Sequence, residues 1–124
     1  MADHNDLGKE GEERAREYLQ SKGYKIRHTN WVPFGSKNEL DIVAEKDGML
    51  VVVEVKSRST ITFEHPEDAI TPAKIRRIVM ATHDYIQAYD LTIETRFDVI
   101  AALSNYKGGF DIEHIEDAFM PPIN

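Results

Sequence analysis

Two apolar runs joined by a short turn constrain the fold of this chain more than any other feature. The runs are Glu39–Ala44 and Leu50–Lys56, and both are rich in Val, Ile and Leu. The Asp47-Gly48 pair between them is a strong signal for a β-hairpin. Yet carboxylates and a lysine interrupt both runs, and a charged side chain in a buried strand costs free energy unless a partner or a ligand compensates it.

The turn predicts which residues face each other across the hairpin. With a two-residue loop, Asp41 lies directly opposite Glu54 and Glu39 opposite Lys56. A four-residue loop gives the same register, whereas a three-residue loop breaks it. Because side chains alternate along a strand, Asp41, Glu54 and Lys56 are expected on one face. Opposite Cβ atoms lie about 4.5–5.5 Å apart, and two carboxylates that close repel unless a cation or a shared proton relieves them. The pattern therefore predicts a divalent-metal site beside a lysine.

The remaining periodicity predicts one α/β domain that spans residues 1–124. Apolar side chains recur at helical spacing over residues 6–21, and Thr71-Pro72 is a favourable start for a second helix that extends to about Tyr89. Besides the hairpin, strands are predicted at residues 24–28, 96–103 and 110–115, and irregular connections at residues 29–38 and 57–70. The order α-β-β-β-α-β-β indicates an α/β sandwich, with helices on the faces of a central mixed sheet.

Composition excludes several functional classes. The chain has no cysteine, so neither a disulfide scaffold nor a cysteine-ligated zinc site is possible. The histidines are scattered without an HExxH pair, and neither a G-x-S-x-G elbow nor a phosphate-binding GxxxxGK loop is present. No apolar run approaches the ~20 residues of a membrane span, and residues 1–6 lack the features of a signal peptide. We therefore expect a cytoplasmic protein without a membrane partner.

The charge distribution bears on nucleic-acid binding. The formal net charge of −7 argues against generic polyanion binding, since phosphate contacts come from Lys and Arg. However, the candidate phosphate-binding cations lie close together in the sequence, at Arg58, Lys74, Arg76 and Arg77. Three of them begin the second predicted helix, where positive charge opposes the helix dipole. Nucleic-acid contact and a solvated basic face are both consistent with this pattern.

Metal-dependent phosphodiester hydrolysis uses all the charged residues of the hairpin. Asp41 and Glu54 offer the oxygen ligands that Mg²⁺ prefers, and the metal would polarise the phosphate and activate a water. Lys56 would hold the nucleophile or neutralise charge in the transition state. Glu12, on the flank of the first helix, would complete the site. The alternative for Glu12 is an exposed helix pair with Arg16.

Other interpretations stay open from the residues alone. Glu39, Glu54 and Lys56 would form an internal ion pair if no ligand binds. Paired carboxylates also serve glycosidases, but a lysine in the same site makes that interpretation more distant. Trp31 and Phe34 would either pack against the sheet, which is the favoured interpretation, or stack on a base.

These residues resemble a known signature. Asp41, twelve intervening residues and Glu54-Val55-Lys56 are similar to the motif of the PD-(D/E)XK nuclease superfamily. The resemblance extends over nearly the whole chain to the YraN-like uncharacterised family within that superfamily, through Gly11-Glu12, Asn30, Glu39–Val43, Val53–Arg58 and Arg96–Ile100. Two positions depart from it: Leu40 stands where the superfamily has Pro, and Asn38 where the family usually has Gly.

The resemblance implies a restriction-endonuclease-like fold, a three-layer α/β sandwich. It also implies a Mg²⁺- or Mn²⁺-dependent nuclease site at Glu12, Asp41, Glu54 and Lys56, with the carbonyl of Val55 as a further ligand. Kinship to Holliday-junction resolvases makes structured or damaged DNA the expected substrate and a homodimer an expected assembly. A non-catalytic nucleic-acid-binding module, or a partner-binding protein that keeps the fold, is the alternative.

Overall fold

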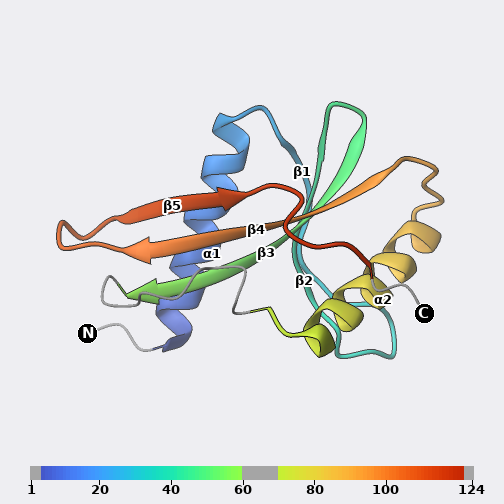
Figure 1. Cartoon of the computed structure of the whole chain (residues 1–124), viewed down its shortest axis with the longest axis horizontal. Coiled ribbons are helices and arrows are strands. Elements are labelled where there is room, and N and C mark those ends of the chain that lie inside the picture. Colours follow the sequence, from blue (N-terminus) through green and yellow to red (C-terminus); the bar gives the residue numbers. More distant parts are fainter. Residues whose placement is uncertain (1–3, 60–69, 122–124) are drawn as a thin grey trace.

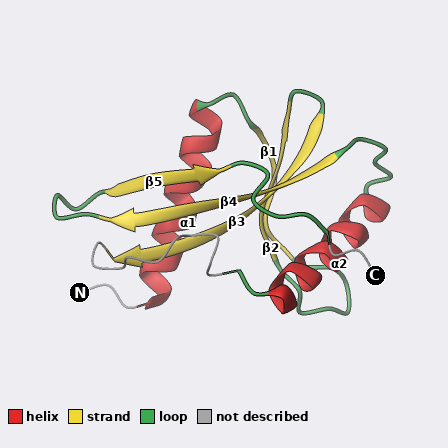
Figure 2. Cartoon of the chain, in the orientation of Figure 1, coloured by secondary structure: helices red, strands yellow, loops and turns green. Residues whose placement is uncertain are grey.

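The chain folds around a five-stranded mixed β-sheet with one helix packed on each face (Figure 1). The computed structural model describes residues 4–59 and 70–121. The elements, coloured by type in Figure 2, are α1 (His4–Ser21), β1 (Lys25–Trp31), β2 (Leu40–Lys46), β3 (Met49–Ser59), α2 (Pro72–Ala88), β4 (Thr95–Ser104) and β5 (Phe110–Ile115). The predicted order of elements is confirmed. None of the described helices is long and apolar enough to cross a membrane.

The strands lie in the sheet in the order in which they occur in the chain. All neighbours are antiparallel except β3 and β4, which run parallel and are connected through α2. Lys46 pairs with Met49, so the predicted two-residue turn is confirmed, and the predicted register holds as far as Ile42 and Val53. The expected pairs Asp41–Glu54 and Glu39–Lys56 lie beyond the paired residues. Both turn residues, Asp47 and Gly48, have positive φ, as a type I′ hairpin turn requires.

The central strands bury both faces. On β3, Val51 and Val53 pack against Ala15 and Leu19 of α1. The alternate residues of β3, such as Val52, belong to a second core that includes side chains of α2, namely Ile78, Ala81 and Tyr85. Because both faces are covered, charged side chains on β2 and β3 are accommodated only toward the ends of these strands.

Two predicted boundaries are wrong. A loop was expected from Thr29, but β1 continues to Trp31, which pairs with Leu40. A connection was expected from Ser57, but β3 continues to Ser59 alongside β4. In both places the neighbouring strand supplies the hydrogen bonds that the local sequence does not signal. Residues 60–69 of the predicted connection lie outside the described part of the chain.

Local contacts near the N-terminal ends of α1 and α2 position one residue of the site on each helix. A Cβ atom on Gly11 of α1 would overlap the Ser57 hydroxyl and lie 3.3 Å from the Cβ of Ala102, so the helix packs directly against β3 and β4 at this point. On α2, the Thr71 side chain accepts a hydrogen bond from the backbone N–H of Lys74, which confirms the predicted cap. These contacts place the residues next to them, Glu12 and Lys74, at the same edge of the molecule.

Candidate functional site

A pocket of about 270 Å³ lies where β2 and β3 meet the N-terminal parts of both helices. Its lining includes all four residues that were predicted to be catalytic, Glu12, Asp41, Glu54 and Lys56, together with Val55 and Lys74. Two of these residues come from helices and the others from the central strands. The fold therefore gathers on one pocket residues that are far apart in the sequence.

Asp41 is tied to β3 by its own side chain. The β2–β3 ladder ends at Ile42 and Val53, and beyond it the Oδ2 atom of Asp41 accepts a hydrogen bond of 2.9 Å from the backbone N–H of Val55. Burial, reinforced by the negative charge of Glu54, raises the pKa of the Asp41 carboxyl to about 8, although the bond from Val55 opposes this shift. The Asp41 carboxyl group is thus held beside β3, where its surroundings do not fully stabilise a negative charge.

Glu54 has a lysine from α2 as its counter-ion. Its side chain is almost fully buried, and its Oε1 atom lies 2.8 Å from the Nζ atom of Lys74. Burial lowers the pKa of Lys74, but the bond to Glu54 outweighs burial, so the pKa is raised overall. The alternative interpretation, an internal ion pair among Glu39, Glu54 and Lys56, is not found in the described part of the chain, because Glu54 pairs with Lys74. Local sequence could not reveal this partner, because α2 reaches Glu54 only through the crossover between β3 and β4.

Lys56 lies beside this pair and is half-buried. Burial lowers the pKa of its ammonium group, and the positive charge of Lys74 lowers it further. Among the described residues it forms no salt bridge with an acidic side chain. Its ammonium group is therefore available to the pocket and releases its proton more readily than an ordinary lysine does.

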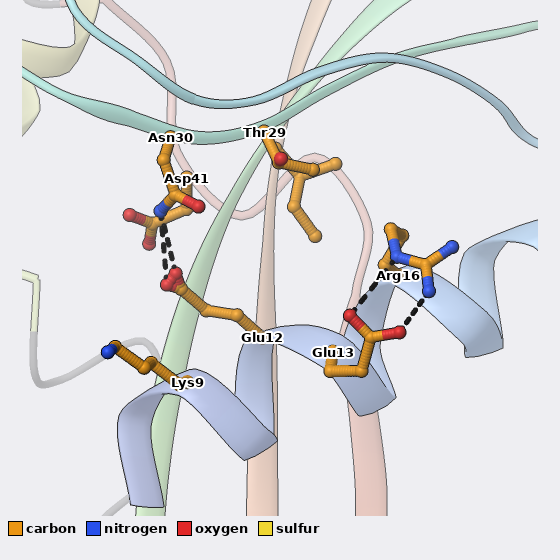
Figure 3. Close-up of a pocket in the computed structure, with 8 residues that line it drawn as sticks. Lys9, Glu12, Glu13, Arg16, Thr29, Asn30 and Asp41 are labelled. Carbon is orange, nitrogen blue, oxygen red and sulfur yellow. Dashed lines mark hydrogen bonds and ion pairs between the residues drawn. The ribbon is translucent and has the colours of Figure 1, made fainter. Parts of the chain in front are cut away.

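Glu12 of α1 lines this pocket and also a neighbouring one, drawn in Figure 3, where Asn30 of β1 donates a hydrogen bond to its carboxylate. The Nδ2 atom of Asn30 donates to Glu12 Oε1 at 2.9 Å and to Glu39 Oε2 at 2.9 Å. Burial raises the pKa of Glu12, whereas the bond from Asn30 opposes the shift. The alternative pair between Glu12 and Arg16 is wrong, because Arg16 instead forms an ion pair with the exposed Glu13.

Asn30 is a residue of the site that sequence reasoning missed. It carried part of the family resemblance but had no assigned role. Its φ of 51° lies in the left-handed region, which Asn tolerates better than most residues, and its amide joins two carboxylates from separate elements. Neither the backbone conformation nor the partners are encoded in a local pattern.

The predicted nucleic-acid-binding cations are not all at the site. Lys74 lines the central pocket, and Arg77 lines an adjoining groove of about 380 Å³ together with Lys37 and Asp41. Arg76, exposed on α2, and Arg58, partly exposed on β3, stand outside the described linings of both cavities. Of these cations, Lys74 and Arg77 therefore line cavities that contain Asp41, as does Lys56.

The oxygen-rich donor set fits a hard cation, although its carboxylates already have other partners. Within residues 4–59 and 70–121, no three carboxylate or imidazole side chains converge as a ready-made metal cluster. Lys74 forms an ion pair with Glu54, and Asn30 donates a hydrogen bond to Glu12. Nevertheless, the carboxylates of Asp41 and Glu54 lie in one pocket with Val55, and the raised pKa of Asp41 indicates negative charge that a cation would relieve.

Fold and site together define an α/β protein with a mixed five-stranded sheet and an acidic pocket, flanked by lysines, at one end of its central strands. The chain belongs to the Uncharacterised protein family UPF0102, which it matches over residues 11–102, and the predicted YraN-like membership is thereby confirmed. It is 52% identical to the UPF0102 protein of Phocaeicola vulgatus over 99% of both chains. It is also 52% identical to the UPF0102 protein FP2501 of Flavobacterium psychrophilum, over 96% of this chain and 98% of that one. The residues that the family model matches include Glu12, Asp41, Glu54 and Lys56 of the acidic pocket, but not Leu7 and Gly8, which also line it.

Proposed function

We propose that this protein is a Mg²⁺-dependent endonuclease that hydrolyses phosphodiester bonds in structured or damaged DNA, on a restriction-endonuclease-like fold. The observation that carries the proposal is the convergence of Glu12, Asp41, Glu54 and Lys56 on one pocket. This set combines oxygen ligands for a metal with a lysine of lowered pKa, and both kinds of group can stabilise the transition state of phosphodiester hydrolysis.

The carboxylates of Asp41 and Glu54 and the backbone carbonyl of Val55 would hold Mg²⁺ or Mn²⁺. The bound metal supplies Lewis acidity toward the phosphate and lowers the pKa of a water. For this to happen Lys74 must release Glu54, since its ammonium group lies 2.8 Å from that carboxylate. Once released, Lys74 is placed to bind a phosphate oxygen of the substrate.

Lys56 and Glu12 act on the reacting water from two sides of the pocket. Lys56 orients the water and, because the pKa of its ammonium group is lowered, exchanges a proton with it more readily than an ordinary lysine. Glu12 accepts a hydrogen bond from the water, and Asn30 fixes the orientation of the Glu12 carboxylate. Asn30 is therefore a positioning residue in this mechanism.

The substrate contacts must be local, because the chain as a whole carries a net charge of −7. Lys74 and Arg77 lie next to the carboxylates and would bind the phosphates flanking the scissile bond. Arg58 and Arg76 would contact the backbone farther away. We further propose that residues 1–124 act as one domain in the cytoplasm, with a homodimer placing two such sites on one branched DNA.

A non-catalytic nucleic-acid-binding module is the second candidate. The Lys74–Glu54 ion pair favours it, since this pair neutralises the buried carboxylate without any metal. In that case Lys74, Arg76 and Arg77 would matter more than Glu54, and binding would weaken steeply with salt. A partner-binding protein that keeps the fold would instead retain its partner after nuclease treatment of a pull-down.

Cleavage of a labelled panel of DNA substrates tests the proposed activity. The panel contains a four-way junction, a flap, a single strand and a duplex, each incubated in Mg²⁺ and in Mn²⁺. We expect cutting that requires the metal and that falls by at least about 10²-fold in both Glu54→Gln and Lys56→Ala, because each change removes a group acting at the reacting phosphate. Glu113→Gln, which alters an exposed carboxylate on β5, is the matched control and should cut like the parent protein.

Two results would count against the proposal. Equal cutting by the parent protein and both site variants would assign the activity to a contaminant. Salt-sensitive binding of the panel without any cutting would favour the non-catalytic module.

A further inference from the structure

Phe34 presents its ring to solvent from a constrained turn. Its relative exposure is 107%, the highest among the exposed large apolar residues of the described chain. The turn is closed by a 3.1 Å hydrogen bond from the backbone N–H of Ser36 to the carbonyl of Pro33. Gly35 has a φ of +77°, as the third residue of a type II turn requires, and Pro33 is buried. Phe34 is therefore exposed on a turn with a defined backbone conformation.

The two aromatic residues considered in the sequence have different environments. Trp31 packs in the fold, with its ring centroid 4.9 Å from that of Tyr85 and 6.3 Å from that of Tyr89. Packing, the favoured interpretation, is thus confirmed for Trp31 and is wrong for Phe34. Since burial of an aromatic ring is favourable, an outward Phe on a well-defined turn is an unused contact surface.

The turn lies beside the proposed catalytic pocket. In Figure 1 the segment between β1 and β2 runs along α2. A groove of about 380 Å³ separates this segment from α2, and its lining includes Lys37, Asp41, Lys74 and Arg77. Lys37 is the third residue after Phe34, and Asp41 lines the same groove. A strand of nucleic acid in this groove would contact its cations and the Asp41 carboxylate, and Phe34 stands on the turn that leads into the groove lining.

We propose that Phe34 stacks on an unpaired base of the substrate while Lys37 and Arg77 bind the adjacent phosphates. The protein would therefore prefer DNA that contains an unpaired nucleotide over an intact duplex. In an intact duplex, neighbouring bases cover both faces of every base, whereas an unpaired base offers a free face. This inference rests on the proposed function, because it assigns the groove that contains Asp41 to the substrate strand.

Base stacking would explain why an exposed aromatic ring stands near a groove lined by cations. An aromatic ring stacks on any of the bases, so the interaction reads the absence of pairing and not the sequence. The turn already fixes the backbone around Phe34, so this segment loses little backbone freedom on binding. The cations on either side of the groove supply the phosphate contacts that this acidic chain lacks as a whole.

Binding of a fluorescent DNA tests the inference. The probe is a hairpin duplex with one 2-aminopurine in a single-nucleotide bulge, compared with the same duplex fully paired, in Ca²⁺, with cleavage followed in parallel in Mg²⁺. We expect the parent protein to bind the bulged DNA at least about fivefold more tightly and to quench its fluorescence. Phe34→Ala should lose both the preference and the quenching, whereas Phe34→Trp should keep them.

Tyr106→Ala provides the matched control. Tyr106 is 92% exposed in the turn between β4 and β5, and its removal should change neither readout. In Figure 1 this turn lies at the opposite side of the molecule from the segment between β1 and β2. If the protein cuts DNA in a metal-dependent manner but Phe34→Ala keeps the preference for bulged DNA, the inference about Phe34 is wrong while the proposed activity stands. A Phe34-dependent preference without any cutting would overturn the nuclease activity alone, and no binding of either DNA would overturn both. A Phe34→Ala variant that keeps the preference but sediments as a smaller species would make Phe34 a subunit contact instead.

Discussion

Asp98→Asn is expected to lower the free energy of unfolding by about 3–5 kcal/mol at pH 7, the cost of breaking a buried ion pair by removing one partner. Asp98 on β4 has no exposed surface. Its carboxylate accepts hydrogen bonds from Arg96 at 2.7 and 2.9 Å, from His114 Nε2 at 2.7 Å and from the backbone N–H of Asp117 at 3.0 Å. The amide of Asn cannot match the charge or the number of these acceptor contacts, and it leaves the Arg96 guanidinium without its main partner.

The pH dependence of the stability loss in Asp98→Asn distinguishes loss of the charged network from loss of side-chain packing. Burial raises the pKa of Asp98, but the bonds from His114 and Arg96 outweigh burial, so the folded-state pKa is lowered overall. A depressed pKa stabilises the fold above the unfolded-state value, and that contribution is lost as the pH falls through the folded-state value. Urea denaturation at pH 7 and at pH 3 measures the effect. The deficit of Asp98→Asn should shrink at pH 3, and an equal deficit at both pH values would contradict the electrostatic explanation.

Asp111→Asn is the control for this comparison. Asp111 is an exposed carboxylate on β5, the neighbouring strand to β4, and its replacement should change the free energy of unfolding by less than about 0.5 kcal/mol. A large loss in this variant as well would show that the sheet edge, and not the Asp98 network, limits stability.

The second large effect has the opposite sign: Asp41→Asn should stabilise the metal-free protein at alkaline pH. The folded-state pKa of Asp41 is raised from an ordinary 3.8 to about 8, by burial and by the charge of Glu54. The folded protein therefore binds this proton more tightly than the unfolded chain, and stability falls as the pH rises between these two values. Asn carries no charge and can still accept the hydrogen bond from Val55, so the variant escapes this loss.

The measurement is thermal or urea unfolding in EDTA at pH 5 and at pH 8.5. We expect Asp41→Asn to exceed the parent protein by on the order of 2–3 kcal/mol at pH 8.5, and by much less at pH 5. In a separate series without EDTA, Mn²⁺ at pH 8.5 should stabilise the parent protein and leave the variant nearly unchanged. A variant that is less stable than the parent protein at both pH values would show that the Asp41 carboxylate is not under electrostatic stress.

The hairpin could be predicted because its signals are local. An Asp-Gly turn between two β-rich runs fixes the register, and the alternation of side chains then puts Asp41 and Glu54 near each other. The cap at Thr71 and the limits of β5 followed from equally local patterns. The extensions of β1 and β3 did not, because pairing with a neighbouring strand overrides weak local preference.

The partners within the site could not be predicted in the same way. Lys74 was expected to face solvent or DNA, yet it forms an ion pair with Glu54. Its position depends on where α2 packs against the sheet, which the local sequence does not reveal. Asn30 was not assigned a role, since its importance comes from a left-handed backbone and from contacts with Glu12 and Glu39. Helix periodicity placed Glu12 on the flank of α1 but gave no means of choosing between Arg16 and Asn30 as its partner.

Calorimetric titration with Mn²⁺ at pH 7.5 tests the central claim most directly, because it requires no knowledge of the substrate. The parent protein should bind the metal, and Asp41→Asn and Glu54→Gln should each weaken binding by at least about tenfold, with circular dichroism unchanged. Glu113→Gln should bind like the parent protein. Lys74→Met should bind more tightly, since the metal no longer competes with an ammonium group 2.8 Å from Glu54. Equal affinity in the parent protein, Asp41→Asn and Glu54→Gln would contradict the assignment of these carboxylates as a metal site.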